Sequence, residues 1–470
     1  MQRRDFIKVG AAAVTAAPAI VSAAAAPQKV RMGFIGVGNR GTQLLHLFMR
    51  QPDVEVTALC DVYEPFLKRD ESAFDPKFLD WGLKDRLPVF KGKDGQLLPD
   101  EKRVLDSVKV RTCKLYADYR RLLEDANVDA VCIAVPDHWH AIMAIDAIKA
   151  GKDVYCEKPL TATVAEGRAM VNAQKASKQI ACVGLNRRGS AVYRKLKGEI
   201  DSGKYGTFRV GRAAHVSNLF PNGIGKCPQC QPPKGFDWDK WLGPRAFRPY
   251  KYTIAPYYFR WHGDFSSQMG NWGVHYLDAL RWMMGEVAPS AVTAVGGQYF
   301  LDHDGDIPDT MEVTFEFPDK KLIHFMIYEG GTARPIFTRE LELQGSDGAI
   351  YANERGYDIF PQRSREFGNP KKPLFGERHY ESKDMQADDG SDSICTSTVI
   401  RDFLDRVKDR GTPLCTLEDG HRSTCFAHLA NIALRMGQRL QWDPASEKFT
   451  NCPKANELLS YTYRDGYVLG

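Results

Sequence analysis

The sequence predicts an α/β protein, with an N-terminal doubly wound parallel sheet and a C-terminal α/β domain whose large, open sheet is mostly antiparallel. Strand-like and helix-like segments alternate from Lys29 to Cys182, which is typical of a parallel sheet with crossover helices. Farther along, strand-like runs follow one another without helices between them, which indicates antiparallel pairing. A chain of 470 residues is also too long for one ordinary domain.

The first 26 residues are predicted to be a twin-arginine export signal and not part of the fold. Arg3 and Arg4 begin a basic segment, an Ala-rich stretch follows over 9–20, and small residues at 22–26 offer a cleavage site. A membrane anchor needs about 20 strongly apolar residues, whereas this stretch is mostly alanine and is broken by Pro18. We therefore expect a periplasmic or otherwise exported protein with no stable membrane span.

Charge and composition argue against nucleic acid as a partner. The formal net charge is +5, of which the leader supplies +2, so the remaining chain is nearly neutral at +3. No basic run or basic–aromatic alternation is present. A hydrophobic content of 43% also excludes wholesale disorder.

The elements of the first domain, expected over 29–156, follow in order from the leader. We predict strands at 30–35, 54–60, 128–135 and 153–156, and helices at 42–50 and 140–150. The segment 74–108 breaks this rhythm with charges, glycines and prolines, and is predicted to be a surface insertion.

The second domain, expected over 157–470, has a different texture. We predict helices at 190–202, 272–284 and 422–439, and strands at 208–215, 291–299, 310–317, 321–328 and 340–344. A long stretch rich in Pro, Gly and Trp spans 218–264. Loops of that length in a compact domain are functional or disordered, and the aromatic content argues against disorder.

A glycine-rich turn predicts a dinucleotide site. Gly36-Val37-Gly38-Asn39-Arg40-Gly41 ends a strand pattern and opens a helix pattern. The first glycine permits the tight turn, the second lets a pyrophosphate approach the backbone, and the third lets the helix pack closely on the strand. The helix N-terminus then offers free N–H groups to the phosphates. The alternative is a doubly wound domain that binds no nucleotide.

The nucleotide is expected to be NAD, with NADP possible. Asp61 closes the second strand, twenty positions after Gly41. Its carboxylate can accept hydrogen bonds from a ribose 2′-hydroxyl and would repel a 2′-phosphate. Arg40 weakens this preference, because an arginine beside the turn can grip a phosphate.

Two segments are candidates for the chemistry. Glu157-Lys158-Pro159 follows a predicted strand, where open parallel sheets place their ligands. Burial would lower the pKa of Lys158 and let it move the proton that accompanies hydride transfer. The alternative is a solvated lysine before a turn. In the later helix, Asn271, His275 and Asp278 can share one face, and Asp278 or a backbone carbonyl could fix the tautomer of His275. The alternative is a structural histidine.

The eleven cysteines do not form an evenly spaced framework. Cys227 and Cys230 are the one pair with ligand-like spacing, but a structural zinc site needs four ligands and no second pair follows. We expect a loop disulfide or two free thiols there, and no metal site.

These motifs together resemble the Gfo/Idh/MocA oxidoreductases, which include glucose–fructose oxidoreductase and inositol dehydrogenase. The resemblance covers nearly all of the mature chain, and Glu157-Lys158-Pro159 is its most specific element. It also rests on the glycine turn, Asp61, the segment Pro136-Asp137-His138-Trp139-His140 and Gly273-x-His275. The segments 236–244 and 420–423 resemble an exported bacterial subgroup.

The resemblance implies an N-terminal Rossmann domain, a C-terminal sheet that often mediates homo-oligomers, and hydride transfer between nicotinamide and a sugar or polyol. It implies that Lys158 and His275 are the acid/base pair. The residues assigned to the cofactor are Gly36, Gly38, Asn39, Arg40, Gly41, Asp61, Pro136, His138, His140, Glu157 and Lys158. Those assigned to the carbohydrate are Lys158, Arg187, Asn271, His275 and Trp261.

One departure from the family pattern concerns Asn271. Many members have aspartate four residues before the histidine, and asparagine cannot take a proton. A proton relay between Lys158 and His275 is therefore favoured over a relay through residue 271. This chain also need not act on the same substrate as the members that have aspartate there. The main hypothesis is an NAD-dependent sugar or polyol dehydrogenase. The alternatives are a glycoside-cleaving enzyme with transient oxidation at C3, and a non-catalytic binding protein. Free nicotinamide nucleotides are scarce outside the cytoplasm, so the predicted export suggests that the cofactor is tightly bound.

Overall fold

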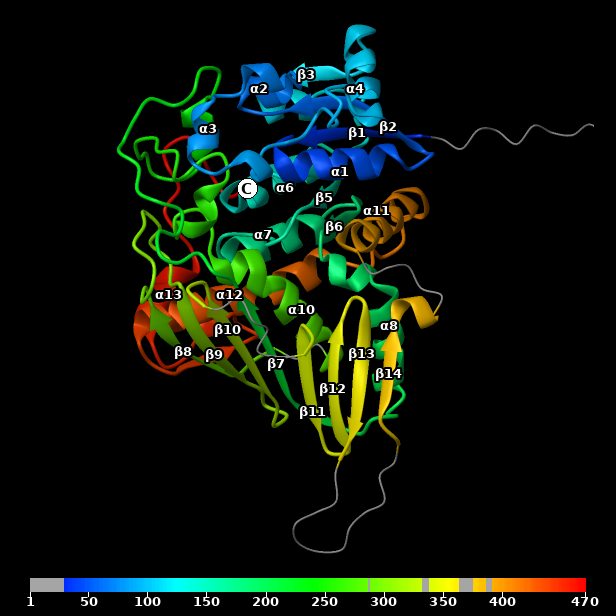
Figure 1. Cartoon of the computed structure of the whole chain (residues 1–470), viewed down its shortest axis with the longest axis vertical. Helices are drawn as coiled ribbons and strands as arrows, with labels where there is room; N and C mark the ends of the chain where they lie inside the picture. The colour runs from blue at the N-terminus through cyan, green and yellow to red at the C-terminus, as the bar shows by residue number, and fades with distance from the viewer. Residues whose placement is uncertain (1–28, 286–287, 332–337, 363–374, 386–390) are drawn as a thin grey trace, which may run out of the picture.

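The computed structural model describes residues 29–285, 288–331, 338–362, 375–385 and 391–470, and within them the chain forms two sheets. The parallel sheet and its helices occupy the upper part of the molecule in Figure 1, and the larger sheet the lower part. The predicted fold class is confirmed. The predicted export signal lies outside the described residues.

The first sheet has six parallel strands in the order β3-β2-β1-β4-β5-β6. Their bounds are β1 Val30–Ile35, β2 Val54–Cys60, β3 Lys114–Tyr116, β4 Ala130–Ile133, β5 Asp153–Cys156 and β6 Ala181–Val183. Every residue of β4, β5 and β6 is buried, as expected for parallel strands covered on both faces. The strand order reverses between β1 and β4, and ligands bind at such a switch point, beyond the carboxyl ends of the strands.

Helices connect these strands. They are α1 Asn39–Met49, α2 Glu64–Leu67, α3 Lys77–Asp80, α4 Pro99–Lys109, α5 Tyr119–Leu123, α6 Asp137–Lys149 and α7 Val164–Lys175. Both predicted helices, at 42–50 and 140–150, begin three residues early. Helix α1 begins within the glycine motif, after the extended N-cap residue Gly38, and α6 begins shortly after β4, at the extended N-cap residue Pro136. The insertion over 74–108 is partly helical, because it contains α3 and most of α4.

The predicted boundary at residue 156 is wrong. β6 pairs with β5, so the parallel sheet continues to residue 183. A late helix, α11 (Asp392–Asp409), also returns to this domain and packs on α1. Arg401 of α11 pairs with Asp53 at 2.7 Å. No pattern in the sequence shows that a segment some 350 positions later completes the first domain.

The second sheet has ten strands in the order β14-β13-β12-β11-β7-β10-β9-β8-β15-β16, and only β7 and β10 run parallel. Their bounds are β7 Phe208–Val216, β8 Ala291–Gly297, β9 Thr310–Glu316, β10 Leu322–Tyr328, β11 Leu341–Gly345, β12 Gly348–Asn353, β13 Gly356–Pro361, β14 Arg378–Glu381, β15 Leu440–Asp443 and β16 Lys448–Phe449. The strands after β11 were missed because they are short and rich in Gly and polar residues.

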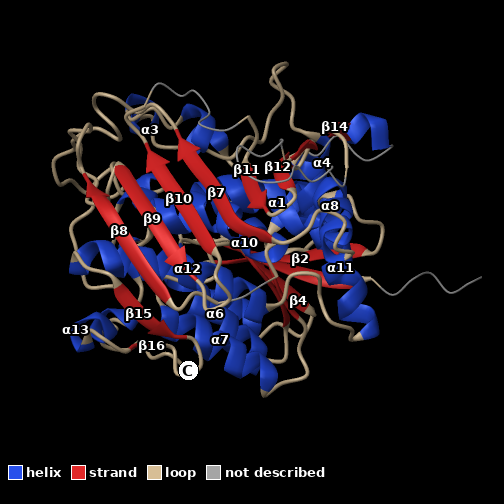
Figure 2. Ribbon diagram, turned by 90° about the horizontal axis from the view of Figure 1, so that it is seen from below, coloured by secondary structure: helices blue, strands red, loops and turns tan. Residues whose placement is uncertain are grey.

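Helices cover one face of this sheet, as Figure 2 shows with the opposite face toward the viewer. The covering helices are α8 Ala191–Asp201, α10 Val274–Met283 and α12 Leu417–Met436. The short α13 Pro453–Asn456 contacts α12 and β16, and the short α9 Trp238–Leu242 belongs to the aromatic loop. Along β9, buried residues alternate with more exposed ones, which reflects the two different faces. The helix predicted at 422–439 begins earlier, at a capping box formed by Thr416 and Asp419.

The long aromatic loop over 218–264 is packed against the first domain. Phe236 forms a backbone bridge with Tyr63, and their rings meet edge to face at 5.5 Å. Trp238 and Trp241 stack at 4.8 Å and are buried. Much of the aromatic content therefore fixes the loop to the Rossmann domain.

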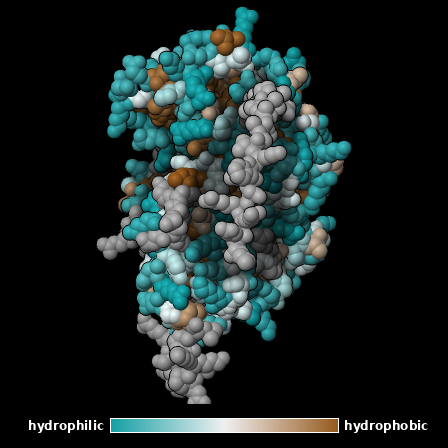
Figure 3. All heavy atoms as spheres, turned by 90° about the vertical axis from the view of Figure 1, so that its right-hand side faces the viewer, coloured by the Kyte–Doolittle hydropathy of each residue, from teal (hydrophilic) through white to brown (hydrophobic). Residues whose placement is uncertain are grey.

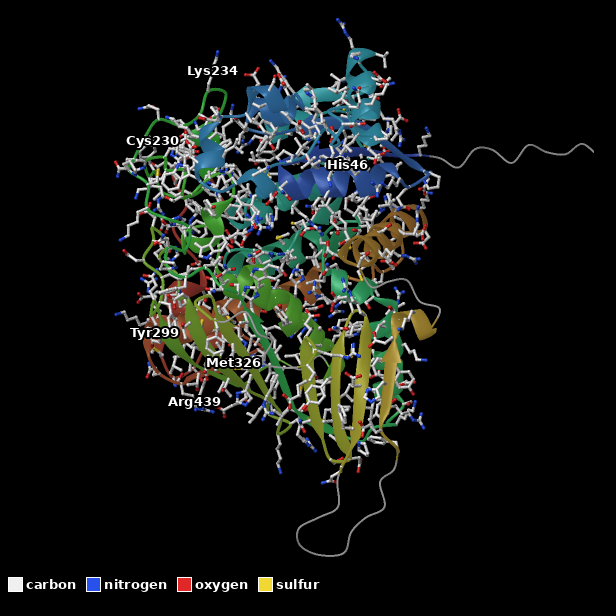
Figure 4. All side chains as sticks on the ribbon, in the orientation of Figure 1. His46, Cys230, Lys234, Tyr299, Met326 and Arg439 are labelled. Atoms are coloured by element: carbon white, nitrogen blue, oxygen red, sulfur yellow. The ribbon has the colours of Figure 1, made fainter. Side chains whose placement is uncertain are left out.

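Cys227 and Cys230 are both free thiols in the structure, without a loop disulfide between them. Figure 4 shows Cys230 on the loop at the edge of the molecule, beside α3. The face seen in Figure 3 is largely hydrophilic with scattered apolar groups. Within the described ranges, no helix combines the length and apolarity that a bilayer crossing requires.

Candidate active site

The carboxyl ends of β1, β2, β4 and β5 open into a cavity of about 420 Å³, which the start of α10 also lines. Eleven of the predicted site residues line this cavity: Gly36, Gly38, Asn39, Arg40, Asp61, Pro136, Glu157, Lys158, Arg187, Asn271 and His275. Residues from both predicted domains therefore meet in one place.

The glycine turn has the shape that a dinucleotide requires. Gly36 has φ +83°, and a Cβ there would lie 2.7 Å from the Ala134 carbonyl oxygen. A Cβ on Gly41 would lie 1.9 Å from the carbonyl oxygen of Gly36, so this glycine lies behind the turn and serves helix–strand packing. On Gly38 a Cβ would meet nothing closer than 3.4 Å. The space above Gly38 is thus open, and α1 begins there with its N-terminal N–H groups.

Asp61 is fixed beside this turn by the backbone. Its Oδ2 accepts a hydrogen bond from Val37 N at 2.8 Å, and its Oδ1 accepts one from Tyr63 N at 2.9 Å. Burial raises the pKa of Asp61, while these backbone donors oppose the shift. Each carboxylate oxygen keeps a free lone pair, which fits a ribose hydroxyl.

Arg40 is paired with two carboxylates. Its Nε donates to Glu157 Oε1 at 3.0 Å, and its guanidinium also bonds Asp392 of α11 at 3.1 Å. Although burial opposes it, these carboxylates raise the pKa of Arg40. Because both carboxylates neutralise its charge, Arg40 is not free to bind the 2′-phosphate of NADP. The expectation that Arg40 weakens the preference for NAD is therefore not supported.

The side chain of Lys158 contacts Asn271 in the cavity. Its Nζ donates to the Asn271 carbonyl oxygen at 2.9 Å and lies 3.4 Å from Asn271 Oδ1. Burial lowers the pKa of Lys158 to about 8. An ammonium group has three N–H donors, so one remains for a substrate hydroxyl.

His275 lies near the start of α10, directly after a π-helical turn, Met269–Gly273. Burial, with the charges of Arg187 and Lys158 adding to it, lowers the pKa of His275 well below its usual value. The imidazole is therefore neutral. Among the described residues neither of its ring nitrogens has a hydrogen-bond partner, and Nδ1 is buried.

The prediction that Asp278 could orient His275 is wrong. Asp278 accepts hydrogen bonds from Arg188 at 3.0 Å and from Ser423 at 2.7 Å, within the core of the second domain. His275 and Asp278 both lie in α10, but partners from distant segments take up the carboxylate of Asp278, and no sequence spacing reveals them. The assignment of Arg187 to the cavity stands, and its guanidinium is held by Glu340 at 2.8 Å.

Trp261 does not line the cavity, contrary to its assigned role in sugar packing. Its Nε1 donates to Glu329 Oε2 at 3.0 Å. Gln268 donates to the other oxygen of Glu329 at 2.7 Å and accepts from Asn271 Nδ2 at 3.1 Å. This chain of bonds fixes the amide of Asn271 with its oxygen toward Lys158. Trp261 thus acts on the cavity only through the residues between them.

His138 and His140 also lie behind the cavity wall, contrary to their assignment to the cofactor. Nε2 of His138 is 3.0 Å from the Trp241 carbonyl oxygen, and burial lowers the pKa of His138 to about 3. The ring of His140 bridges the carbonyl oxygens of Pro159 and Val135, at 2.8 and 2.9 Å. Helix α6 is buried on nearly all sides, so the histidines join elements instead of facing the ligand.

Several cavity residues were missed. Asp137 lies inside the quoted Pro136–His140 motif and could have been found by its place after β4. Trp272 lines the cavity and stacks on His215 with 4.7 Å between ring centroids. Arg86, from the insertion, and Arg260, from the aromatic loop, had no signal in the sequence.

Comparisons with family models agree with this architecture. The model of the NAD-binding Rossmann fold of the Gfo/Idh/MocA oxidoreductase family matches residues 95–185. The model of the C-terminal alpha/beta domain of the same family matches residues 247–438. Together the two models cover more than half of the chain.

Individual relatives share less than 30% sequence identity with this chain. Myo-inositol 2-dehydrogenase of Thermotoga maritima is 24% identical over 411 residues, covering 86% of this chain and 96% of that protein. A glycosyl hydrolase family 109 protein of Shewanella sp. (strain ANA-3) is 28% identical over 193 residues, which cover 40% of this chain and only 36% of that relative. The structure of levoglucosan dehydrogenase with NADH and levoglucosan shares the fold, with a TM-score of 0.60, 17% identity, and coverage of 88% of this chain and 99% of that one.

Proposed function

Because the chain belongs to the Gfo/Idh/MocA family of oxidoreductases, we propose that it transfers hydride between NAD and a secondary hydroxyl carbon of a sugar, glycoside or polyol. The observation that carries this proposal is the meeting of Lys158 and His275 in the cavity that the glycine turn also lines. Similarity to a myo-inositol 2-dehydrogenase over most of both chains supports the substrate class.

Lys158, His275 and Asn271 have different roles in such a reaction. The glycine turn and Asp61 would hold NAD, which would supply the acceptor for the hydride of the carbinol carbon. Lys158, in its neutral form, takes the hydroxyl proton as the C–O bond gains double-bond character, and returns that proton in the reverse direction. The neutral imidazole of His275 hydrogen-bonds the same hydroxyl and shares in the proton transfer. Asn271 positions Lys158 through two contacts to its Nζ.

The proposal is tested by a panel of neutral and acidic sugars, polyols and aryl glycosides. Nicotinamide fluorescence and phenol release are followed separately on the purified protein. We expect net reduction of NAD with at least one free sugar or polyol and no phenol release. If no compound changes the redox state of the nicotinamide, the proposal is wrong.

A second candidate, cleavage of a glycoside through transient oxidation at C3, is supported by the similarity to glycosyl hydrolase family 109 proteins. It requires elimination of the leaving group, addition of water and return of the hydride. Phenol release from an aryl glycoside with no net NADH would favour it over the dehydrogenase.

Replacing Asn271 by aspartate should shift the pH dependence of sugar oxidation upward. With a pKa of about 8, Lys158 is mostly protonated at neutral pH, so kcat/KM should rise with pH and level off above about pH 8. A carboxylate at position 271 favours the ammonium form, which raises this pKa by about one unit or more. The pH profile of kcat/KM measures the shift. Asn271→Ala is the uncharged control; an equal upward shift there would contradict the electrostatic explanation.

We also propose that the protein is exported in folded form with its cofactor bound, as the predicted twin-arginine leader favours. The double replacement Arg3→Lys and Arg4→Lys should keep the protein in the cytoplasm, as measured by cell fractionation. The wild-type protein from the exported fraction should release NAD when denatured. Export of the double variant, or an exported wild type without nucleotide, would contradict this proposal. The homo-oligomer expected from the family stays a prediction.

A further inference from the structure

Two guanidinium groups of the cavity, those of Arg86 and Arg260, form no ion pair with any described residue. Four other cationic side chains that line the cavity have a carboxylate partner: Arg40 with Glu157 at 3.0 Å, Arg187 with Glu340 at 2.8 Å, Lys240 with Asp237 at 3.0 Å and Arg120 with Asp118 at 3.6 Å. Lys158 instead contacts the backbone and side-chain oxygens of Asn271. Among the described residues, neither Arg86 nor Arg260 thus has a carboxylate within ion-pair distance, although the charge of Asp137, which also lines the cavity, acts on Arg260.

Both groups lie against the same ring. The guanidinium carbon of Arg260 is 4.2 Å from the ring centroid of Tyr257, and that of Arg86 is 5.2 Å from it. Arg260 also donates to the Tyr257 carbonyl oxygen at 2.8 Å and lies over Phe259 at 4.4 Å. The aromatic contacts hold Arg260 in place and leave most of its N–H donors without a partner.

The surroundings of Arg260 make an unpaired charge costly. The residue is half-buried, and burial lowers its pKa. Tyr257, Asp137 and Glu157 oppose this shift, and Arg86 adds to it. This is the reverse of Arg40 and Arg187, whose pKa values are raised by their carboxylates. Two like charges beside one ring repel each other. A bound anion would reduce this repulsion and the free-energy cost of burying the charge of Arg260.

The position relative to Lys158 indicates which molecule supplies that anion. Arg260 and Lys158 line the same cavity, and the charge of Arg260 contributes to the lowered pKa of Lys158. The phosphates of a dinucleotide already have the glycine turn and the start of α1. An anion near Lys158 is therefore better explained as part of the substrate.

We propose that Arg260, with Arg86 nearer the solvent, forms a subsite for an anionic group of the substrate, so that the preferred substrate is an acidic carbohydrate. Carboxylate, sulfate and phosphate esters share the planar or forked oxygen geometry that a guanidinium binds in bidentate fashion. This inference rests on the proposed function, because it names the substrate class of the same cavity.

The test compares matched pairs of sugars on the NAD-loaded protein. Glucuronate is set against glucose, galacturonate against galactose, and a sugar sulfate against its parent sugar. For each pair of sugars that the protein oxidises, we expect kcat/KM to be at least ~10-fold higher for the acidic member. This ratio corresponds to the free energy of one hydrogen bond to a charged group. Arg260→Gln should remove that preference, so that the ratio of kcat/KM for the acidic member to kcat/KM for the neutral member falls to about one. Arg86→Gln, at an exposed position, should remove part of it.

Arg248→Gln is the matched control, because Arg248 lies in the same loop, pairs with Asp264 and does not line the cavity. Calorimetric titration of the acidic sugar into each NAD-loaded variant gives a readout that is independent of turnover. Equal kcat/KM for both members of every pair, or a preference that survives in both Arg260→Gln and Arg86→Gln, would overturn the subsite while leaving hydride transfer intact. Weaker NAD binding by Arg260→Gln with an unchanged sugar preference would assign Arg260 to the cofactor and likewise overturn it.

Discussion

Lys158→Met should lower kcat/KM for sugar oxidation by about three orders of magnitude, because a positioned acid or base contributes 10²–10⁴-fold. Methionine fills a similar space but cannot hold the hydroxyl proton. The apolar side chain also removes the two contacts of Nζ with Asn271 without adding charge. Steady-state kinetics with the best substrate of the panel measures the loss, and it should be found mainly in kcat.

The bound nucleotide is the internal control for this variant. Denatured Lys158→Met should release as much NAD as the wild type, because the glycine turn and Asp61 are untouched. His275→Ala should show a loss in the same direction and also retain NAD. If either variant keeps near-normal turnover, the role assigned to that residue is wrong.

The second large effect is expected at Gly41. In Gly41→Ala the new Cβ would lie 1.9 Å from the Gly36 carbonyl oxygen, which no side-chain rotation can relieve because the neighbour is backbone. Helix α1 must move away from the turn, and the phosphate site moves with it. We therefore expect loss of detectable NAD binding and a lower melting temperature, measured by nucleotide release and thermal unfolding.

Gly198→Ala is the matched control for Gly41→Ala. Gly198 lies exposed on α8, where a Cβ would meet nothing within 4 Å. Alanine there should leave NAD content unchanged and stabilise the helix by up to about 1 kcal/mol. A Gly41→Ala protein that is loaded with NAD like the wild type would refute the explanation of the turn.

The parts of the site that the sequence predicts are those that a strand end fixes locally. Gly36, Asp61 and Lys158 follow β1, β2 and β5, and the carboxyl ends of parallel strands meet at one edge. The prediction needed only a strand pattern and the few residues that follow it. This logic extends to Asp137 after β4, which was quoted within a motif but given no role.

The errors arose where tertiary packing decided the outcome. His138 and His140 belong to a helix that is buried on nearly all sides, so their direction could not follow from their place in the motif. Asp278 lies on α10 with His275, but its carboxylate is bonded by Arg188 and Ser423, which are far from it in the sequence. Trp261 belongs to a loop whose packing against distant residues no local pattern reveals.

The most direct test of hydride transfer to NAD is a single turnover with sugar deuterated at its ring carbinol carbons. The protein is loaded with NAD, mixed with the deuterated form of its best substrate, and quenched, and the nicotinamide is analysed by mass spectrometry. The account predicts one deuterium in the nicotinamide ring for each substrate oxidised, and much less label with Lys158→Met. Conversion of the sugar with no deuterium in the nicotinamide at any quench time would contradict it.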